Sequence, residues 1–105
     1  MKLFGLKNCD TCRKALKSLA NAEFVDVRAD GVPTEILERA FAEFGQTLLN
    51  RRSTTWRDLG PEDRESDPIK LLQRYPTLMK RPLIVDEQTY YLGWTPDTQS
   101  ALGAG

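Results

Sequence analysis

The chain has 105 residues, of which 40% are hydrophobic and 29% charged, so it is long enough to bury a core without disulfide staples. Fifteen basic and fifteen acidic side chains give a net charge of zero, which offers no electrostatic basis for binding nucleic acid. No apolar run approaches the ~20 residues of a membrane span, and the opening residues do not form a signal peptide. We therefore expect a cytoplasmic monomer that binds neither nucleic acid nor membrane.

The sequence contains two cysteines and no histidine. In a reducing compartment, two cysteines are more typical of catalysis or metal binding than of a permanent disulfide. A structural zinc site takes four nitrogen or sulfur ligands, and Cys9 and Cys12 supply only two, so we expect no metal. Carboxylates or a second subunit could complete such a site. Ser-His-Asp and Cys-His catalysis are excluded. If a cysteine is the nucleophile, groups other than an imidazole must stabilise its thiolate.

Apolar spacing in the first part of the chain predicts a strand, a helix and a second strand, at residues 2–6, 11–21 and 23–27. This order indicates a parallel crossover unit. After a break at 31–33, Thr34 is a candidate cap for a helix that runs up to Gly45. The middle of the chain, 46–76, is polar, with predicted helical pieces at 46–50, 54–59 and 67–75.

The last part of the chain predicts a β-hairpin and a short helix. The strands are expected at 83–85 and 89–92 with a turn at 86–88, and Thr95-Pro96 opens the helix. Residues 62–65 are expected to be a solvated loop. The predicted order is β-α-β, a helical insertion at about 34–76, and β-β-α. We therefore predict an α/β, thioredoxin-like mixed sheet and a single domain over 1–105.

The segment Cys9-Asp10-Thr11-Cys12 lies where the first strand passes into the first helix. Free backbone N–H groups and the helix dipole stabilise an anion at such a position, so the pKa of Cys9 should be lowered. Cys12, one turn later, is either a resolving thiol or a core residue. Lys7 and Arg13 add positive charge nearby, while Asp10 opposes it. The position of this pair favours redox chemistry over two packed cysteines.

Arg81-Pro82 precedes an apolar strand late in the chain. In thioredoxin-like folds a cis-proline occupies this place beside the reactive cysteine. A given X–Pro bond is cis only about 5–6% of the time, but the element order favours cis here over a rigid trans turn.

Three motifs together resemble the arsenate reductase (ArsC) family, in its YffB-like branch. The resemblance covers nearly the whole chain and rests on Cys9-x-Thr11-x-Arg13, on Leu48-Leu49-Asn50-Arg51-Arg52 with Thr54-Thr55-Trp56-Arg57-Asp58-Leu59-Gly60, and on Lys80-Arg81-Pro82-Leu83-Ile84-Val85. It implies a glutaredoxin-like fold with a helical insertion. It also implies glutathione as a co-substrate, with no bound cofactor.

Residue roles follow from the same resemblance. Cys9 attacks the substrate, and thiols, Cys12 among them, resolve the adduct. Arg81 helps to hold an oxyanion next to Pro82, and Arg51 or Arg52 matches a mid-chain arginine of the family. The fork of arginine suits arsenate and the carboxylates of glutathione alike. The remaining residues expected at the substrate or glutathione site are Asn8, Thr11 and Arg13.

Two positions depart from the family's arsenate reductases. A third arginine is missing where this chain has Leu92-Gly93-Trp94-Thr95, and Gly5 replaces a histidine four residues before the nucleophile. These departures favour a glutathione-dependent reductase of small-molecule or protein disulfides over an arsenate reductase coupled to glutathione or glutaredoxin. A different class of function is also open: an Spx-like regulator that binds RNA polymerase and uses the two cysteines as a redox switch.

Overall fold

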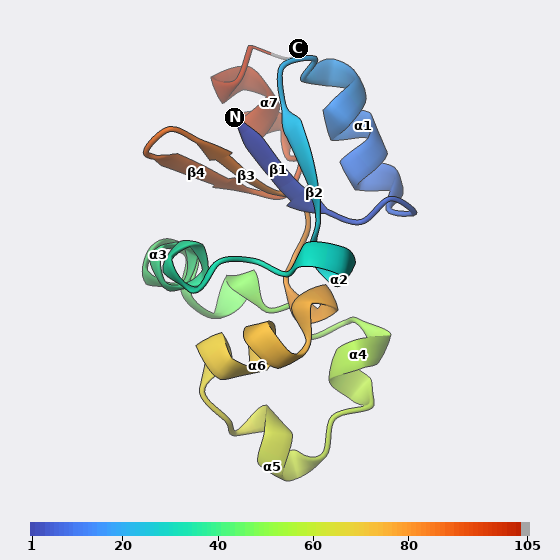
Figure 1. Ribbon diagram of the computed structural model, residues 1–105, viewed down its shortest axis with the longest axis vertical. Helices are drawn as coiled ribbons and strands as arrows, with labels where there is room; N and C mark the ends of the chain where they lie inside the picture. Colours follow the sequence, from blue (N-terminus) through green and yellow to red (C-terminus); the bar gives the residue numbers. More distant parts are fainter. Residues whose placement is uncertain (104–105) are drawn as a thin grey trace. The chain divides into compact units, whose positions relative to one another are not determined.

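A four-stranded mixed sheet organises one part of the chain, and the computed structural model describes residues 1–103 (Figure 1). The strands are β1 (Lys2–Gly5), β2 (Glu23–Asp26), β3 (Leu83–Asp86) and β4 (Thr89–Leu92). Their order is β2-β1-β3-β4, with β1 and β2 parallel and the other two pairs antiparallel. The predicted crossover unit, hairpin and thioredoxin-like mixed sheet are confirmed.

The chain divides into two compact units. Unit 1 combines Met1–Asp30 with the chain from Arg81 onward, and so brings the sheet's two halves together. Unit 2, Gly31–Lys80, contains the predicted helical insertion.

The core of unit 1 lies between the sheet and helix α1 (Asp10–Ser18). One row of side chains crosses all four strands, because Leu3 pairs with Phe24 and with Ile84, which in turn pairs with Tyr91. Alternate side chains of a strand point to the same face, so this row forms one apolar surface. The α1 residues buried against it are Cys12 and Ala15, followed by Leu19 at the helix end.

Two shorter helices complete unit 1. Helix α2 (Val27–Asp30) follows β2 directly, where the sequence predicts a strand residue at position 27. One-turn helices carry no apolar periodicity, which explains the difference. Helix α7 (Pro96–Ala101) begins as predicted, because the Thr95 hydroxyl accepts a hydrogen bond from the backbone N–H of Thr98. This cap fixes the start of α7.

Unit 2 consists of short helices. They are α3 (Thr34–Phe44), the 3-10 turn Gly45–Leu48, α4 (Thr54–Arg57), α5 (Pro61–Arg64), α6 (Pro68–Arg74) and the 3-10 turn Pro76–Leu78. Leu49 and Met79 form an isolated antiparallel bridge that joins segments far apart in the sequence. Two backbone hydrogen bonds of 2.8 Å, from Asn50 N to Leu78 O and from Lys80 N to Leu48 O, flank the bridge.

Two local predictions in unit 2 are wrong. Thr34 does not cap α3; it is the first helical residue, and its hydroxyl oxygen accepts a hydrogen bond from Gln73 Nε2 at 2.6 Å. The residue at the N-cap position is Pro33. Residues 62–64, expected in a loop, belong to α5, which opens with Pro61 at a position where proline's missing N–H is not needed.

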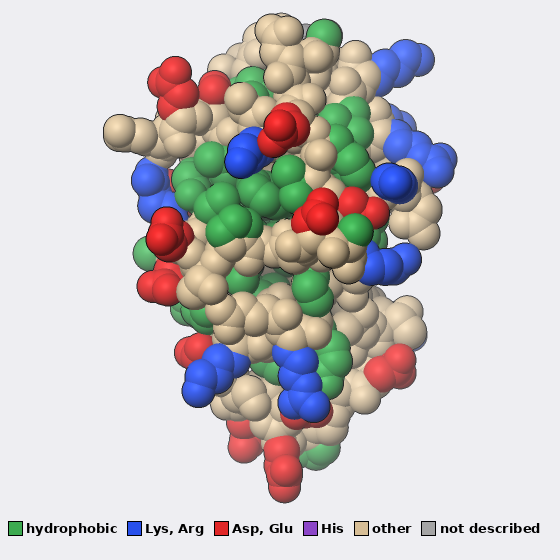
Figure 2. Space-filling view, viewed as in Figure 1, with side chains coloured by type: hydrophobic (Ala, Val, Ile, Leu, Met, Phe, Trp, Pro, Cys, Tyr) green, Lys and Arg blue, Asp and Glu red, His purple; other side chains and the backbone are tan. Residues whose placement is uncertain are grey.

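Basic and acidic side chains are interspersed over the face drawn in Figure 2, in keeping with the zero net charge. Among residues 1–103, none of the helices is both long enough and apolar enough to cross a membrane.

Candidate active site

Cys9 stands directly before the first residue of α1 and has extended backbone angles, φ −94° and ψ 116°. Its N–H donates to Leu6 O at 3.2 Å, and its carbonyl accepts from Arg13 N at 3.0 Å, so its backbone is fixed on both sides. The side chain is half-buried and packs against the apolar cluster of unit 1. The sulfur is therefore held at the end of the helix that carries the positive pole of the dipole.

Several neighbours determine the acidity of Cys9. Partial burial alone raises its pKa, but the backbone and the thiol of Cys12, followed by a hydrogen bond and the positive charge of Arg81, lower it. The net effect is a pKa below the ordinary value of a cysteine. Since the thiolate is the nucleophilic form, the site favours reactivity at Cys9 near neutral pH.

Cys12 has the opposite character. Burial, to which the hydrogen bond and negative charge of Cys9 add, raises the pKa of Cys12 to about 12, although the backbone of Leu6 and the charge of Arg81 act against this. The side chain is fully buried and the residue forms no disulfide with Cys9. Cys12 therefore remains a neutral thiol that donates a hydrogen bond to the Cys9 thiolate.

Arg81 reaches Cys9 from the segment that precedes β3. The Arg81–Pro82 peptide bond is cis, as the element order predicts. Pro82 is buried, and its carbonyl accepts a hydrogen bond from Gly93 N at 2.8 Å, which ties this segment to the end of β4. Three of the predicted site residues, Cys9, Cys12 and Arg81, thus lie together in unit 1.

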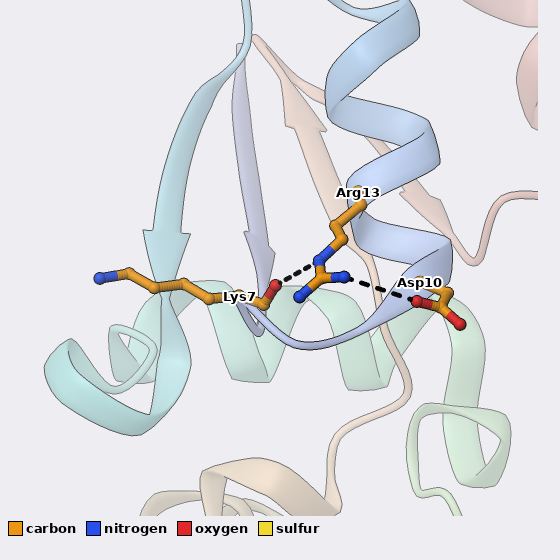
Figure 3. Close-up of polar contacts among 3 residues, drawn as sticks. All are labelled: Lys7, Asp10 and Arg13. Carbon is orange, nitrogen blue, oxygen red and sulfur yellow. Dashed lines mark hydrogen bonds and ion pairs between the residues drawn. The ribbon is translucent and has the colours of Figure 1, made fainter.

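The Arg13 side chain contacts the loop that carries Cys9 (Figure 3). Its Nε donates to the Lys7 carbonyl at 2.8 Å, and its Nη1 lies 3.8 Å from Asp10 Oδ1. The sequence assigns Arg13 to substrate binding, yet its guanidinium spans from Lys7 to the first turn of α1. This arrangement makes Arg13 a brace for the Cys9 loop.

The other two predicted residues of this loop are exposed. Asn8 lies in the turn before Cys9, and Thr11 in the first turn of α1. Neither side chain forms a hydrogen bond or ion pair within residues 1–103. Both are available to a ligand at this edge of unit 1.

Unit 2 carries a cationic pocket. We use this name for an open depression of about 470 Å³ lined by Thr47, Leu49, Asn50, Arg51, Arg52 and Lys80. Three of these side chains are positively charged and none is acidic. The bridge between Leu49 and Met79 holds the two chain segments together and so brings Lys80 beside the two arginines.

The two arginines of the cationic pocket differ in their neighbours. Arg51 donates to the side-chain oxygen of Gln46, and its guanidinium carbon lies 5.5 Å from the centre of the Trp56 ring. Arg52 and Lys80 form no side-chain hydrogen bond or ion pair in the described part of the chain. The side chain of Arg51 is thus held in place by its neighbours and lines the pocket. The side chains of Arg52 and Lys80 keep N–H donors that can bind an anion.

No group of three or more potential metal-ligating side chains is arranged around a common point within residues 1–103.

The site and the sheet together define a thiol-bearing domain of the thioredoxin-like class. The sequence model of the ArsC family matches residues 4–102, and the chain belongs to that family.

Relatives of known sequence agree with this assignment. An uncharacterised protein of Haemophilus influenzae is 39% identical over 101 residues, which span 88% of this chain and 89% of that protein. The global transcriptional regulator Spx of Streptococcus pyogenes is 31% identical over 106 residues, which span 90% of this chain and 78% of Spx.

Solved structures place the fold in the same family. A protein named YFFB superposes with a TM-score of 0.87 at 34% identity, over 96% of both chains. An arsenate reductase related protein from Brucella melitensis gives a TM-score of 0.70 at 30% identity, over 95% of this chain and 91% of that one. An arsenate reductase from Vibrio cholerae shares the fold, with a TM-score of 0.78 over 97% of this chain and 98% of that one, but only 16% identity.

Sequence reasoning missed some residues that shape these sites. In the sequence, Lys80 stands out only as part of a motif. Its place in the cationic pocket depends on the bridge between residues 49 and 79. Gln46, which fixes Arg51, has no motif of its own. The close approach of Gly5 to Cys12 is likewise evident only in the folded chain. Lys80 depends on a contact between distant segments. Gln46 and Gly5 lie close in sequence to the residues that they contact, but these contacts depend on how side chains are placed in the fold, which the linear pattern does not encode.

Proposed function

We propose that the protein is a glutathione-dependent thiol/disulfide reductase in which Cys9 is the nucleophile. The observation that carries this proposal is the pairing of unlike thiols at the start of α1. The pKa of Cys9 is lowered with the help of Cys12 and Arg81, while the pKa of Cys12 is raised. This combination gives one thiolate ready to attack and one protonated neighbour that stabilises it.

The first step is attack on a disulfide. With a glutathionylated partner, the Cys9 thiolate attacks the sulfur of glutathione, the Cys9–sulfur bond forms as the original S–S bond breaks, and the partner leaves as a thiolate that takes a proton from solvent. Arg81 lies beside Cys9 and stabilises the negative charge before it moves.

Two routes then release Cys9. In the monothiol route, the thiolate of a second glutathione attacks the bound glutathione sulfur, so oxidised glutathione forms and Cys9 leaves as a thiolate. In the dithiol route, Cys12 attacks Cys9, expels the bound thiol and leaves a Cys9–Cys12 disulfide. Two glutathione molecules then reduce this disulfide and become oxidised glutathione. The substrate gains two electrons in either route.

Recognition of glutathione is assigned to cationic and polar side chains. Glutathione carries two carboxylates, which suit arginine and lysine. In unit 1 we assign this role to Asn8 and Thr11, which are exposed in the segment around Cys9. The cationic pocket within unit 2 is a separate candidate for binding a glutathione carboxylate, with Arg52 and Lys80 as its donors. We assign Arg51 to shaping this pocket, because Gln46 and Trp56 already hold it.

Mass spectrometry after exposure to oxidised glutathione tests the proposal. We expect a glutathione adduct on Cys9 in the Cys12→Ala variant, and either that adduct or a Cys9–Cys12 bridge in the unaltered protein. The Cys9→Ser variant should form neither product. Titration of the Cys9 thiolate absorbance in the unaltered protein measures the pKa of Cys9, because Cys12 keeps its proton up to a pKa of about 12. A Cys9 that forms no adduct and has the free-cysteine pKa of about 8.5 would contradict the proposal.

Arg81 provides a matched test of the thiolate environment. Arg81→Lys keeps the positive charge and loses the guanidinium hydrogen bonds, whereas Arg81→Met loses both. We expect the alkylation rate of Cys9 at neutral pH to fall in both variants, and further in Arg81→Met, because charge and hydrogen bonding each lower the Cys9 pKa. Equal rates in all three proteins would exclude Arg81 from the site.

A second candidate function is a redox-switched regulator, which the similarity to Spx over 90% of this chain favours. In that case the Cys9–Cys12 disulfide is itself the signal and glutathione is not turned over. An assay of disulfide reduction with glutathione, combined with binding to RNA polymerase, separates the two candidates. Binding that requires both cysteines, without turnover, supports the regulator and contradicts the reductase.

Arsenate reduction is an alternative reading within the same thiol chemistry. Protection of cells against arsenate that is lost in Cys9→Ser would support it. We expect no protection, because Gly93 and Trp94 stand where the family's arsenate reductases have their third arginine.

A further inference from the structure

Gly5 ends β1 and lies directly against the second thiol of the site. A Cβ atom added at Gly5 would lie 2.5 Å from Cys12 Sγ and 3.2 Å from Cys12 Cβ. Ordinary van der Waals contacts of a Cβ atom begin at 3.4 Å. The space that any larger residue would use at position 5 is therefore already filled by the sulfur of Cys12.

Backbone conformation does not explain the glycine. Among the described glycines, the positive φ angles belong to Gly31, Gly45, Gly93 and Gly103. Gly5 has an ordinary strand conformation that any residue adopts. A glycine within a strand weakens it and often marks the close approach of another group, which is here a side chain from α1.

The sulfur that fills this space is the one that acts on Cys9. Cys12 is 0% exposed, and its thiol lowers the pKa of Cys9 through a hydrogen bond. Position 5 is next to Leu6, whose backbone also faces the Cys12 thiol. The Cys12 sulfur thus lies among three fixed groups: the end of β1, the Leu6 backbone and Cys9.

We propose that Gly5 is a positioning residue for the two-thiol site: the absence of a side chain at position 5 sets the Cys12 sulfur against Cys9. This inference rests on the proposed role of Cys9 as the nucleophile. It implies that the protein accommodates either a side chain at position 5 or a Cys12 sulfur hydrogen-bonded to Cys9, but not both. A residue as small as alanine at position 5 is expected to displace the thiol.

The test compares Gly5→Ala with Gly60→Ala. Gly60 is a matched control, because nothing lies within 4 Å of a Cβ added there and its φ is −72°. In Gly5→Ala we expect the pKa of Cys9 to rise and its alkylation rate at pH 7 to fall about threefold or more, because the Cys12 hydrogen bond is lost. The Cys9–Cys12 disulfide should also form less readily in a glutathione redox buffer. Gly60→Ala should match the unaltered protein in both measurements.

A double-mutant cycle separates this role from a general effect on folding. Once Cys12→Ala has removed the sulfur, Gly5→Ala should leave the alkylation rate of Cys9 unchanged. A slower rate that persists in the Cys12→Ala background overturns the proposal, as does an unchanged rate in Gly5→Ala alone. An ordinary Cys9 pKa in the unaltered protein would instead count against the proposed function.

If Gly5→Ala does not fold, the same variants are compared by thermal unfolding instead of by the alkylation rate of Cys9. Adding Cys12→Ala removes the contact at 2.5 Å and leaves the contact with the Cβ of residue 12 at 3.2 Å and an ordinary contact with Leu3 Cδ2 at 3.4 Å. We then expect the double variant to regain a cooperative thermal transition. Failure to regain it overturns the proposal, because the strain would then come from a group other than the Cys12 sulfur.

Discussion

Cys9 and Cys12 are three residues apart in the chain, yet their surroundings move their acidities in opposite directions. Cys9 lies at the helix start beside Arg81 and is half-buried. Cys12 is enclosed by the sheet and receives the negative field of Cys9. When Cys9 enters a mixed disulfide, its charge disappears, and two of the effects that hold the Cys12 proton disappear with it. Adduct formation thus makes Cys12 more acidic, although burial still opposes its ionisation.

The raised pKa of Cys12 predicts a loss of stability at alkaline pH. The folded protein keeps the Cys12 proton up to a pKa of about 12, whereas a cysteine in the unfolded chain releases it near its ordinary pKa of about 8.5. Between these values the folded state binds more protons, so the free energy of unfolding falls as pH rises, by on the order of 1 kcal/mol per pH unit.

Urea denaturation at a series of pH values between 8 and 11 measures this effect. The Cys12→Ala variant should lose less stability over the same range, because it has no buried thiol to ionise. Cys9→Ala should lose an intermediate amount of stability, because removing the hydrogen bond and charge of Cys9 lowers the pKa of Cys12, while burial still raises it. Parallel pH profiles for the unaltered protein and Cys12→Ala would contradict the prediction.

At the scale of secondary-structure elements, the link between β1 and α1 determines where the Cys9 sulfur lies. Cys9 is bonded through its backbone to Leu6 and Arg13, and the Arg13 side chain returns to the Lys7 carbonyl. A single arginine therefore closes the loop that delivers the nucleophile. The sequence shows that Arg13 adds positive charge near Cys9. It does not reveal the contact with Lys7, because this hydrogen bond joins a side chain to a backbone carbonyl six residues away.

Replacing Arg13 by lysine tests this brace. The variant keeps the charge near Asp10 but loses the Nε donor to Lys7, so we expect faster amide hydrogen exchange at residues 8–10. The change in the free energy of unfolding should stay below about 1 kcal/mol, because the pair is largely exposed.

Arg28→Lys is the matched control for Arg13, since its side chain forms no ion pair or hydrogen bond within the described residues. Its exchange rates at residues 8–10 should equal those of the unaltered protein. Equal exchange in Arg13→Lys and Arg28→Lys would show that the Lys7 contact does not stabilise the loop.

Sequence patterns predicted the longer elements and the one-turn helix α4, but not the one-turn helices α2 and α5. The row Phe24, Leu3, Ile84 and Tyr91 follows from strands with alternating or continuous apolar character, and Thr95 before Pro96 marks the start of α7. Helices α2 and α5 have four residues each, too few for a repeat to emerge. Their formation depends on packing and on Pro61 at the first position of α5.

At the scale of the whole molecule, the candidate chemistry is divided between the two units. Unit 1 contains the thiols, Arg81 and the cis bond before Pro82, all of which the motifs predicted. Unit 2 contains the cationic pocket, of which the motifs predicted only the two arginines. Lys80 joins them through a backbone bridge to Leu49, and such a pairing depends on the folded chain rather than on local sequence.

The cationic pocket predicts salt-sensitive binding of glutathione. We expect Arg52→Gln and Lys80→Gln each to raise the KM for glutathione about threefold to tenfold, with a larger effect at low ionic strength. Steady-state assays at two salt concentrations measure this. Arg57→Gln is the control, because Arg57 is exposed in α4 and does not line the pocket. A KM that depends equally on Arg57, or not at all on Arg52 and Lys80, would rule out this pocket as the glutathione site.

The chain's two tryptophans give each unit its own optical label. Trp94 packs against the apolar cluster of unit 1 that contains Cys12 and against which Cys9 also packs, so its emission reports the thiol environment. Trp56 lies 5.5 Å from the guanidinium carbons of Arg51 and Arg64 in unit 2, where its emission reports the wall of the cationic pocket. Replacing either one by phenylalanine leaves a protein whose fluorescence follows a single unit, without any attached dye.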